Sequence, residues 1–257
     1  MKSGTDEAVS TVIALMLVLA IDATCFAIYS ATYVTGLKQQ SEILHSGEVQ
    51  YAFLRLSSDV DNLYSLGKSG QFSEPVPLGG GDILLSPVKS SGTIELEKNQ
   101  HGSISVTIDS GTFPLMINTT NITYTPSYSS WEPQGYSYRS GVVWITKGTK
   151  ETPADISLYT VREGLVQENN TRNQWLKKAK TVISEGNGNY TMQIISMTPV
   201  DGKNFVTGTG TAKIRLNATE TTEYYENVTS ITPVSEDGVS YPINLTVRIL
   251  SIGVSVE

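Results

Sequence analysis

The side chains that carry most enzyme chemistry are sparse in this chain of 257 residues. Its histidines are His45 and His101, and its single cysteine is Cys25. A Ser-His-Asp arrangement around His101 stays open because Ser and Asp are plentiful, but the G-X-S-X-G elbow that often carries the nucleophile does not occur. The P-loop, HExxH zinc and EF-hand patterns do not occur either. We therefore expect no catalytic residues, no metal and no cofactor.

The most frequent chemical motif is the acceptor for N-linked sugars, Asn-X-Thr. It occurs seven times, whereas chance predicts about three occurrences in a chain of this composition. The acceptors are Asn118, Asn121, Asn169, Asn189, Asn217, Asn227 and Asn244. Composition alone offers another explanation, because strands rich in Thr with Asn at their ends generate such motifs. The excess favours a glycosylated surface protein.

Aromatic side chains concentrate in residues 124–138, YTPSYSSWEPQGYSY. Tyr128, Trp131, Tyr136 and Tyr138 are candidate binding residues, because Tyr and Trp combine an apolar face with a polar tip. Such a cluster stacks on surface glycans or forms a contact between subunits. The alternative is that these aromatics cap the core of a sheet.

Composition and charge exclude one class of partner. The net charge is −7 and the isoelectric point is near 5.0. Since neutralising phosphates requires clustered Lys and Arg, we expect no nucleic acid partner. Cys25 lies within an apolar segment, so we expect neither a disulfide nor a metal site built on cysteine.

The element that positions the rest of the chain is an apolar segment near its beginning. Residues 9–21 and 23–34 are uncharged and are separated only by Asp22. As an α-helix, residues 9–35 would extend roughly 40 Å, enough to cross a hydrocarbon core of about 30 Å. A carboxylate at the middle of a lipid-exposed helix costs about 2.5–3.5 kcal/mol. Asp22 therefore either ends a shorter signal helix or makes a polar contact inside a bundle of like helices.

A helical period continues beyond the apolar segment. Apolar residues recur at spacings of three, four and seven at Val49, Ala52, Phe53, Leu56, Val60, Leu63 and Tyr64. The pattern predicts one helix over residues 9–66, apolar at 9–35 and amphipathic at 37–66, with Gly36 and Gly47 tolerated inside it. Residues 67–82 are rich in Gly, Pro and Ser and predict a linker.

From residue 83 the apolar period changes to two, which indicates β-strands. We predict an α+β fold in which an all-β, sandwich-like antiparallel head domain occupies residues 83–257. In the last strand the apolar phase shifts from odd to even positions, which predicts a β-bulge near Ile249 and Leu250. Five acceptors are out of phase with the apolar residues around them and are expected to face solvent: Asn118, Asn121, Asn189, Asn217 and Asn244.

The N-terminal residues resemble those of archaeal type IV pilin-like proteins. That family carries a class III signal peptide, with a short charged leader and the motif Asp-Arg-Ala-Val-Ser-Pro-Val-Ile-Gly ahead of an apolar helix. The matching residues here are Asp6, Glu7, Ala8, Val9, Ser10, Thr11, Val12, Ile13 and Ala14. This chain departs from the motif at Glu7, Thr11 and Ala14. The resemblance covers about 30 residues closely, and the head agrees in architecture only.

The resemblance implies a processing site. A membrane-embedded prepilin peptidase would remove residues 1–8 as a leader by cutting between Ala8 and Val9, or alternatively between Gly4 and Thr5. Two other kinds of processing stay open, namely conventional signal cleavage near Ala31 and a lipoprotein cut before Cys25.

The resemblance also implies a function. Pilus assembly machinery would draw the chain from the membrane into a cell-surface filament, in which its helix packs against copies of itself or of related pilins. The glycosylated heads would face outward and serve adhesion. The competing hypotheses are a non-polymerising membrane-anchored surface glycoprotein or carbohydrate-binding module, and an extracellular enzyme.

Overall fold

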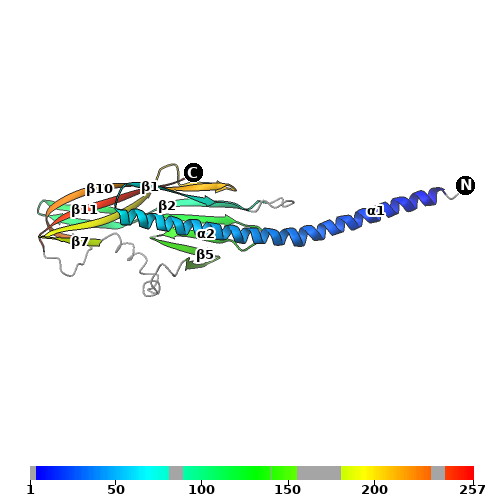
Figure 1. Cartoon of the computed structure of the whole chain (residues 1–257), viewed down its shortest axis with the longest axis horizontal. Helices are drawn as coiled ribbons and strands as arrows, with labels where there is room; N and C mark the ends of the chain where they lie inside the picture. Colours follow the sequence, from blue (N-terminus) through cyan, green and yellow to red (C-terminus); the bar gives the residue numbers. More distant parts are fainter. Residues whose placement is uncertain (1–3, 81–88, 140, 155–180, 233–240) are drawn as a thin grey trace.

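The structure is a computed structural model that describes residues 4–80, 89–139, 141–154, 181–232 and 241–257. Its fold is α+β, with a long N-terminal helix followed by a large mixed β-sheet (Figure 1). The helix projects from the head for about half of its length, and its second half lies along the sheet.

The helix runs without interruption from Gly4 to Leu66. It consists of α1 (Gly4–Tyr29), the π-helical turn η1 (Ser30–Val34) and α2 (Thr35–Leu66). The predicted end at residue 66 is confirmed, because Gly67 adopts the left-handed conformation (φ 54°) and its N–H donates to the Leu63 carbonyl. The start lies before residue 9, so that residues 4–8 of the predicted leader are helical in the intact chain.

The amphipathic half of the helix packs on the head as its period predicts. The stripe residues Val49, Ala52, Phe53, Leu56, Val60 and Leu63 are fully buried, and Tyr64 is partly buried against the same core. The apolar residues of α2 and of the sheet form one continuous cluster. Docking of the helix is therefore part of the hydrophobic core and not a separate contact.

Eleven strands form one sheet in the part of the chain that the structure describes. Their bounds are β1 (Gly70–Pro77), β2 (Ser91–Ile108), β3 (Gly111–Ser127), β4 (Gln134–Arg139), β5 (Val142–Lys147), β6 (Lys150–Pro153), β7 (Thr181–Gly186), β8 (Asn189–Pro199), β9 (Phe205–Gly208), β10 (Thr211–Thr232) and β11 (Ile243–Val256). Their order is β6-β5-β4-β3-β2-β10-β11-β8-β7, with β1 paired to β10 and β9 paired to β2.

Two predictions about the head need correction. β11 pairs with β8 in parallel, so the sheet is mixed and not wholly antiparallel. Strand β1 lies inside the segment predicted as a linker, where it pairs with β10 and buries Val76. Pro75 and Pro77 make this segment resemble a linker, but a strand with only one neighbour tolerates proline because half of its N–H groups need no partner in the sheet.

The predicted sandwich is not seen as two separate sheets among the described strands. The sheet instead folds over, so that β3 and β8 touch although three strands lie between them in the strand order. The backbone N–H of Asn118 in β3 donates to the hydroxyl of Ser196 in β8 at 3.3 Å.

The predicted bulge near Ile249 and Leu250 is wrong. Pairing is continuous there on both sides of β11, with β10 and with β8. The apolar phase shifts because Val247 and Leu250 are both buried although they lie on opposite faces of the strand. The core therefore covers one face of β11 up to Val247 and the opposite face from Leu250 onward.

Candidate functional site

The projecting half of the helix is apolar and uncovered. Its large apolar side chains are between 46% and 65% exposed: Val12, Ile13, Leu15, Met16, Leu17, Val18, Leu19, Ile21, Phe26, Ile28, Tyr29 and Tyr33. The most apolar part is long enough to cross a membrane, and the head buries none of it. Because burying one such side chain contributes about 1.5–3 kcal/mol, covering this surface with lipid or with another protein chain would be strongly favourable.

The residues singled out within this segment lie away from the head. Asp22 is exposed on α1, so its predicted contact with a like helix concerns another molecule and stays a prediction. The hydroxyls of Thr24 and Thr32 donate to the helix backbone four residues earlier, at Ala20 and Ile28. The cleavage positions Gly4, Thr5, Ala8 and Val9 lie in the first turns of α1, and cleavage there also stays a prediction.

The helix enters the head at the π-helical turn. Val34 is the first buried residue between residues 11 and 66 of the helix, and it is the last residue of η1. Tyr29 and Tyr33 stack on each other just before this point, with ring centroids 5.1 Å apart. A single π-helical turn is a common local irregularity at functional positions of helices, and here it marks the boundary between the free and the docked halves.

The first docked turns of α2 bury polar residues. Lys38, Glu42, His45 and Ser46, which we call the polar neck, are at most 4% exposed. They extend the apolar stripe toward the N-terminus at helical spacing, so they lie on the same face of the helix as Val49 and face the head. A buried charge is stable only when hydrogen bonds compensate for its lost hydration.

Glu42 has such compensation. Its carboxylate accepts hydrogen bonds from the hydroxyl of Ser90 at 2.7 Å and from the backbone N–H groups of Ser129 and Ser130 at 2.9 and 3.0 Å. The two N–H donors belong to the loop between β3 and β4. Glu42 thereby ties this loop to the helix at the point where the helix leaves the head.

His45 and Ser46 each bond a buried tyrosine. The Tyr124 hydroxyl donates to the Leu78 carbonyl at 3.1 Å and accepts from His45 Nε2 at 3.1 Å. Ser46 and Tyr136 share a hydrogen bond of 2.8 Å. Burial lowers the pKa of His45 below its usual 6.5, although Glu48 and Glu42 oppose this shift. The polar neck is therefore held by side chains from β3 and β4.

Two of the four candidate binding aromatics are core residues. Tyr136 and Tyr138 are only 1% exposed, because they lie on the face of β4 that packs toward α2, which corrects their assignment as binding residues. Tyr128 and Trp131 are half-buried in the loop after β3, with ring centroids 6.4 Å apart. Lys147 Nζ lies 5.9 Å from the centre of the Trp131 ring. These two aromatics alone remain candidates for binding.

The glycan acceptors lie on the head. Asn189, Asn217, Asn227 and Asn244 are exposed, Asn118 and Asn121 are half-buried, and Asn169 lies outside the described residues. The predicted solvent-facing side chain is thus confirmed for Asn189, Asn217 and Asn244. Asn189 and Asn244 lie directly opposite each other on parallel strands, and Asn244 Nδ2 donates to Asn189 Oδ1 at 3.2 Å.

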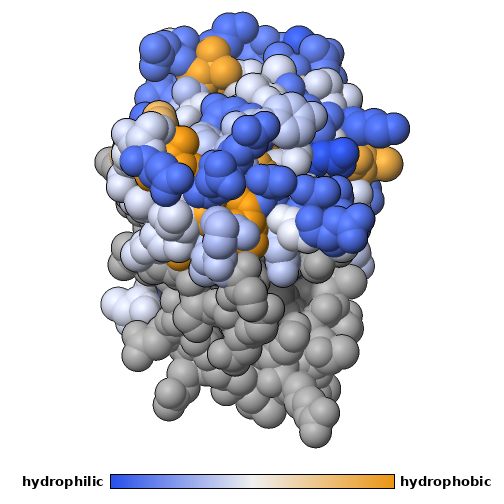
Figure 2. All heavy atoms as spheres, turned by 90° about the vertical axis from the view of Figure 1, so that its left-hand side faces the viewer, coloured by the Kyte–Doolittle hydropathy of each residue, from blue (hydrophilic) through white to orange (hydrophobic). Residues whose placement is uncertain are grey.

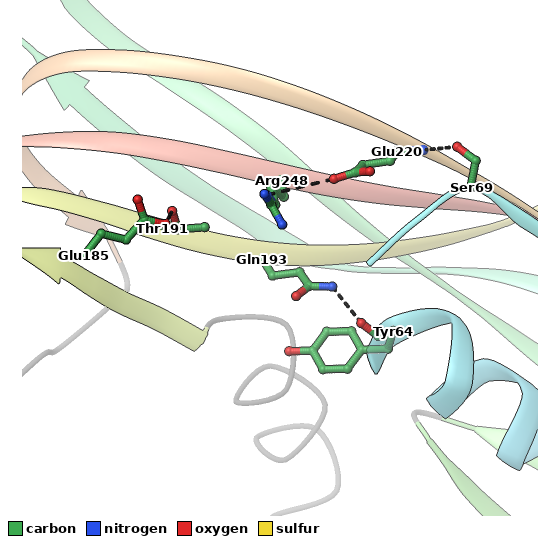
Figure 3. A network of polar contacts seen from close by, with 7 residues as sticks. All are labelled: Tyr64, Ser69, Glu185, Thr191, Gln193, Glu220 and Arg248. Carbon is green, nitrogen blue, oxygen red and sulfur yellow. Dashed lines mark hydrogen bonds and ion pairs between the residues drawn. The ribbon is translucent and has the colours of Figure 1, made fainter. Parts of the chain in front are cut away.

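The end of the head far from the projecting helix presents mostly hydrophilic residues among the described part of the chain (Figure 2). Polar contacts also secure the C-terminal end of α2 there, since Gln193 Nε2 donates to the Tyr64 carbonyl at 2.8 Å (Figure 3). Near this contact, the backbone N–H of Glu220 donates to the Ser69 hydroxyl at 3.2 Å. This end of the molecule suits contact with water.

The residues weighed for catalysis are not brought together in the described part of the chain. His45 is buried in the polar neck, whereas the backbone of His101 lies in β2. Among the described residues, no group of three or more His, Cys, Asp or Glu side chains is placed to hold a metal ion.

Sequence reasoning missed the polar neck. The signal was present, because Lys38, Glu42 and His45 fall at the helical spacing of Val49, but buried polar residues do not stand out in an apolar pattern.

Comparisons of the chain with protein-family models, with curated proteins and with solved structures give no match.

Proposed function

We propose that this protein is a structural subunit of an archaeal type IV pilus-like surface filament. A prepilin peptidase removes residues 1–8, and the subunits polymerise through their N-terminal helices. The observation that carries the proposal is the apolar surface of residues 11–33, which no described part of the head covers and which continues without a break into the docked helix α2. The motif around Ala8 and Val9 agrees with it.

The projecting helix suits two successive environments. In the precursor, lipid covers it and holds the chain at the membrane. In the filament, the helices of other subunits cover the same surface, and a repeated contact of this kind generates an open helical polymer. Asp22 favours the second environment, because a polar partner from a neighbouring helix removes the cost of about 2.5–3.5 kcal/mol that lipid imposes on a carboxylate.

The head supplies the outer surface of this filament. Four of its acceptors are exposed and available to carry sugars, namely Asn189, Asn217, Asn227 and Asn244. Because α2 is packed into the core of the head, the helix and the head are fixed relative to each other. Each head is therefore held at a defined place on the filament surface. The heads then mediate adhesion and other surface contacts.

The test is made on protein purified from the surface of the cells that produce it. Mass spectrometry of the N-terminal peptide is expected to find Val9 or Thr5 as the first residue, and electron microscopy is expected to find filaments. Leu17→Arg places a charge on the exposed apolar helix and should abolish filaments while the head stays folded. Tyr224→Arg is the matched control, since Tyr224 is equally a surface apolar residue but lies on the head.

A different result for the N-terminal peptide would refute the filament proposal. Met1 retained in surface material, together with the absence of any high-molecular-weight assembly, would refute the filament proposal. It would favour the alternative of a non-polymerising membrane-anchored glycoprotein or carbohydrate-binding module, which needs the same helix only as an anchor.

A further inference from the structure

A groove of about 470 Å³ opens on the head, on the face of β3 and β4 opposite α2. Tyr124 and Tyr136 point toward α2, so the side chains that alternate with them along these strands point into the groove. Its polar lining includes Glu97, Thr125, Ser137, Arg139, Thr146 and Glu151. Its volume lies in the range of pockets that hold small ligands.

The lining matches the chemistry of a sugar. Ser and Thr hydroxyls both donate and accept hydrogen bonds, as sugar hydroxyls do, and carboxylates accept further bonds from them. Arg139 is held in place by its ion pair with Glu151 at 2.6 Å and by the Trp144 ring, 5.4 Å from the guanidinium carbon. Pro126 and Pro133 add apolar surface for the C–H face of a sugar ring.

A glycan acceptor lies at the end of this groove. Asn121 is two residues before Thr123, which lines the groove and is also the Thr of the Asn121 acceptor motif. Asn121 pairs with Glu97 across the β2–β3 ladder. On its other side β3 pairs with β4, where Ile122 lies opposite Tyr138. This antiparallel register places Arg139 opposite Asn121. Asn121 therefore lies between two residues of the groove lining, and its half-buried state reflects this position.

We propose that the groove is a saccharide site occupied by the first sugars of the glycan on Asn121. The inference rests on the glycosylated head of the proposed function. Attachment at the end of the groove gives the sugar an effective concentration in the millimolar range, on the order that short flexible linkers provide. Contacts too weak to retain a free saccharide are then sufficient to retain this one. The docked sugar covers the outer face of β3, β4 and β5.

The proposal is tested on the glycosylated protein by mild periodate oxidation, which cleaves vicinal diols, followed by hydrazide labelling and mass spectrometry of each glycopeptide. The comparison site is Asn217, which is exposed on β10. If the Asn121 glycan is docked for three quarters of the time, it labels about fourfold more slowly than the Asn217 glycan in the folded protein. After denaturation both glycans should label equally.

Thr146→Trp fills the groove from β5 without changing the acceptor motif, and it should raise labelling at Asn121 to the rate at Asn217. Thr222→Trp is the control, because Thr222 is also a strand threonine but is exposed on β10, which does not line the groove. As an independent measurement, Asn121→Gln should speed amide hydrogen exchange in residues 134–139 and 142–147, whereas Asn217→Gln should leave it unchanged.

Equal labelling of the two glycans in the folded protein would overturn the proposal and would point to a groove left open for saccharides of other molecules. An unoccupied Asn121 beside occupied acceptors elsewhere would overturn it as well, while leaving the glycosylated filament intact. Absence of filaments with a protected Asn121 glycan would instead refute the proposed function alone.

Discussion

The carboxylate of Glu42 and the hydroxyl of Ser90 are 2.7 Å apart, although 48 residues separate them in the chain. Two backbone N–H groups complete the shell of donors around this buried carboxylate. Glu42 thus joins the base of the projecting helix to two segments of the head. Forces applied to the helix in a filament would reach the head through this contact and the adjoining core.

Removing the Glu42 side chain should destabilise the head strongly. Glu42→Ala leaves one buried and two partly buried donors without an acceptor, and we expect it to lower the free energy of unfolding by about 3–5 kcal/mol. Glu42→Gln keeps one oxygen acceptor and should cost less. Denaturant titration of the full chain in detergent measures both effects, with Glu48→Ala as the exposed control. Equal losses for Glu42→Ala and Glu48→Ala would contradict the assigned role.

Acid should weaken the polar neck through His45. Burial lowers the pKa of His45 in the folded state, so between that pKa and about 6.5 the unfolded chain binds more protons. The stabilisation is complete above about pH 6.5 and declines as the pH falls through this range. The charged or titratable groups near His45 are Glu42, Glu48, Tyr124 and Tyr128.

Thermal unfolding of the full chain in detergent at pH 7.5 and 5.5 measures this effect. His45→Gln removes the titrating ring and should reduce the loss of melting temperature between the two values. The conclusion fails if wild type and variant respond to acid identically. His101→Gln controls for the other histidine of the chain.

Alanine at Gly36 or Gly47 should stabilise the helix. A methyl group at either position would meet no atom within 4 Å, and glycine inside a helix costs about 1 kcal/mol relative to alanine. We expect each change to raise the free energy of unfolding by up to about 1 kcal/mol. Gly67→Ala should act in the opposite direction, because Gly67 has φ 54° and its added methyl would lie 3.2 Å from Gln193 Nε2.

The same denaturant titration distinguishes these variants. If Gly47→Ala stabilises the subunit but filaments are lost, the small size of Gly47 serves contact with another helix. Destabilisation by both Gly36→Ala and Gly47→Ala would contradict the open surroundings of these glycines.

Sugars on Asn189 and Asn244 should exclude each other. The two side chains are in hydrogen-bond contact on strands that lie roughly 4.8 Å apart, which is too close for two attached sugar chains to avoid crowding. We expect few molecules to carry glycans at both positions, and Asn189→Gln should increase occupancy of Asn244. Intact-protein and glycopeptide mass spectrometry measure this, with Asn217→Gln as the control. Frequent double occupancy in folded protein would contradict the expectation.

Much of the helix could be predicted because its signals are local. The spacing of Val49, Phe53 and Leu56 indicated the docked face, and Gly67 lies where the chain needs a left-handed residue to end the helix. Alternation along the later segments also indicated strands and the exposed side of Asn217 and Asn244. Each of these inferences depends on residues no more than a few positions apart.

Other features depended on partners distant in the chain. Pro75 and Pro77 suggested a linker, yet β10 pairs with this segment from more than 130 residues away. Tyr136 and Tyr138 looked like loop aromatics until β4 placed them against α2. In β11 the shift of apolar phase reflected a change in the covered face, and no bulge was needed.

The sequence by itself determined the long helix, its apolar first half and a β-rich head bearing acceptors for sugars, because periodicity and short motifs act over neighbouring residues. Only the tertiary structure decided that the head leaves residues 11–33 uncovered, that Glu42 meets Ser90 and that Asn121 lies beside a groove. These relationships follow from which strands pair and which faces are buried. Those choices bring together apolar side chains from segments far apart in the chain, and no local pattern specifies them.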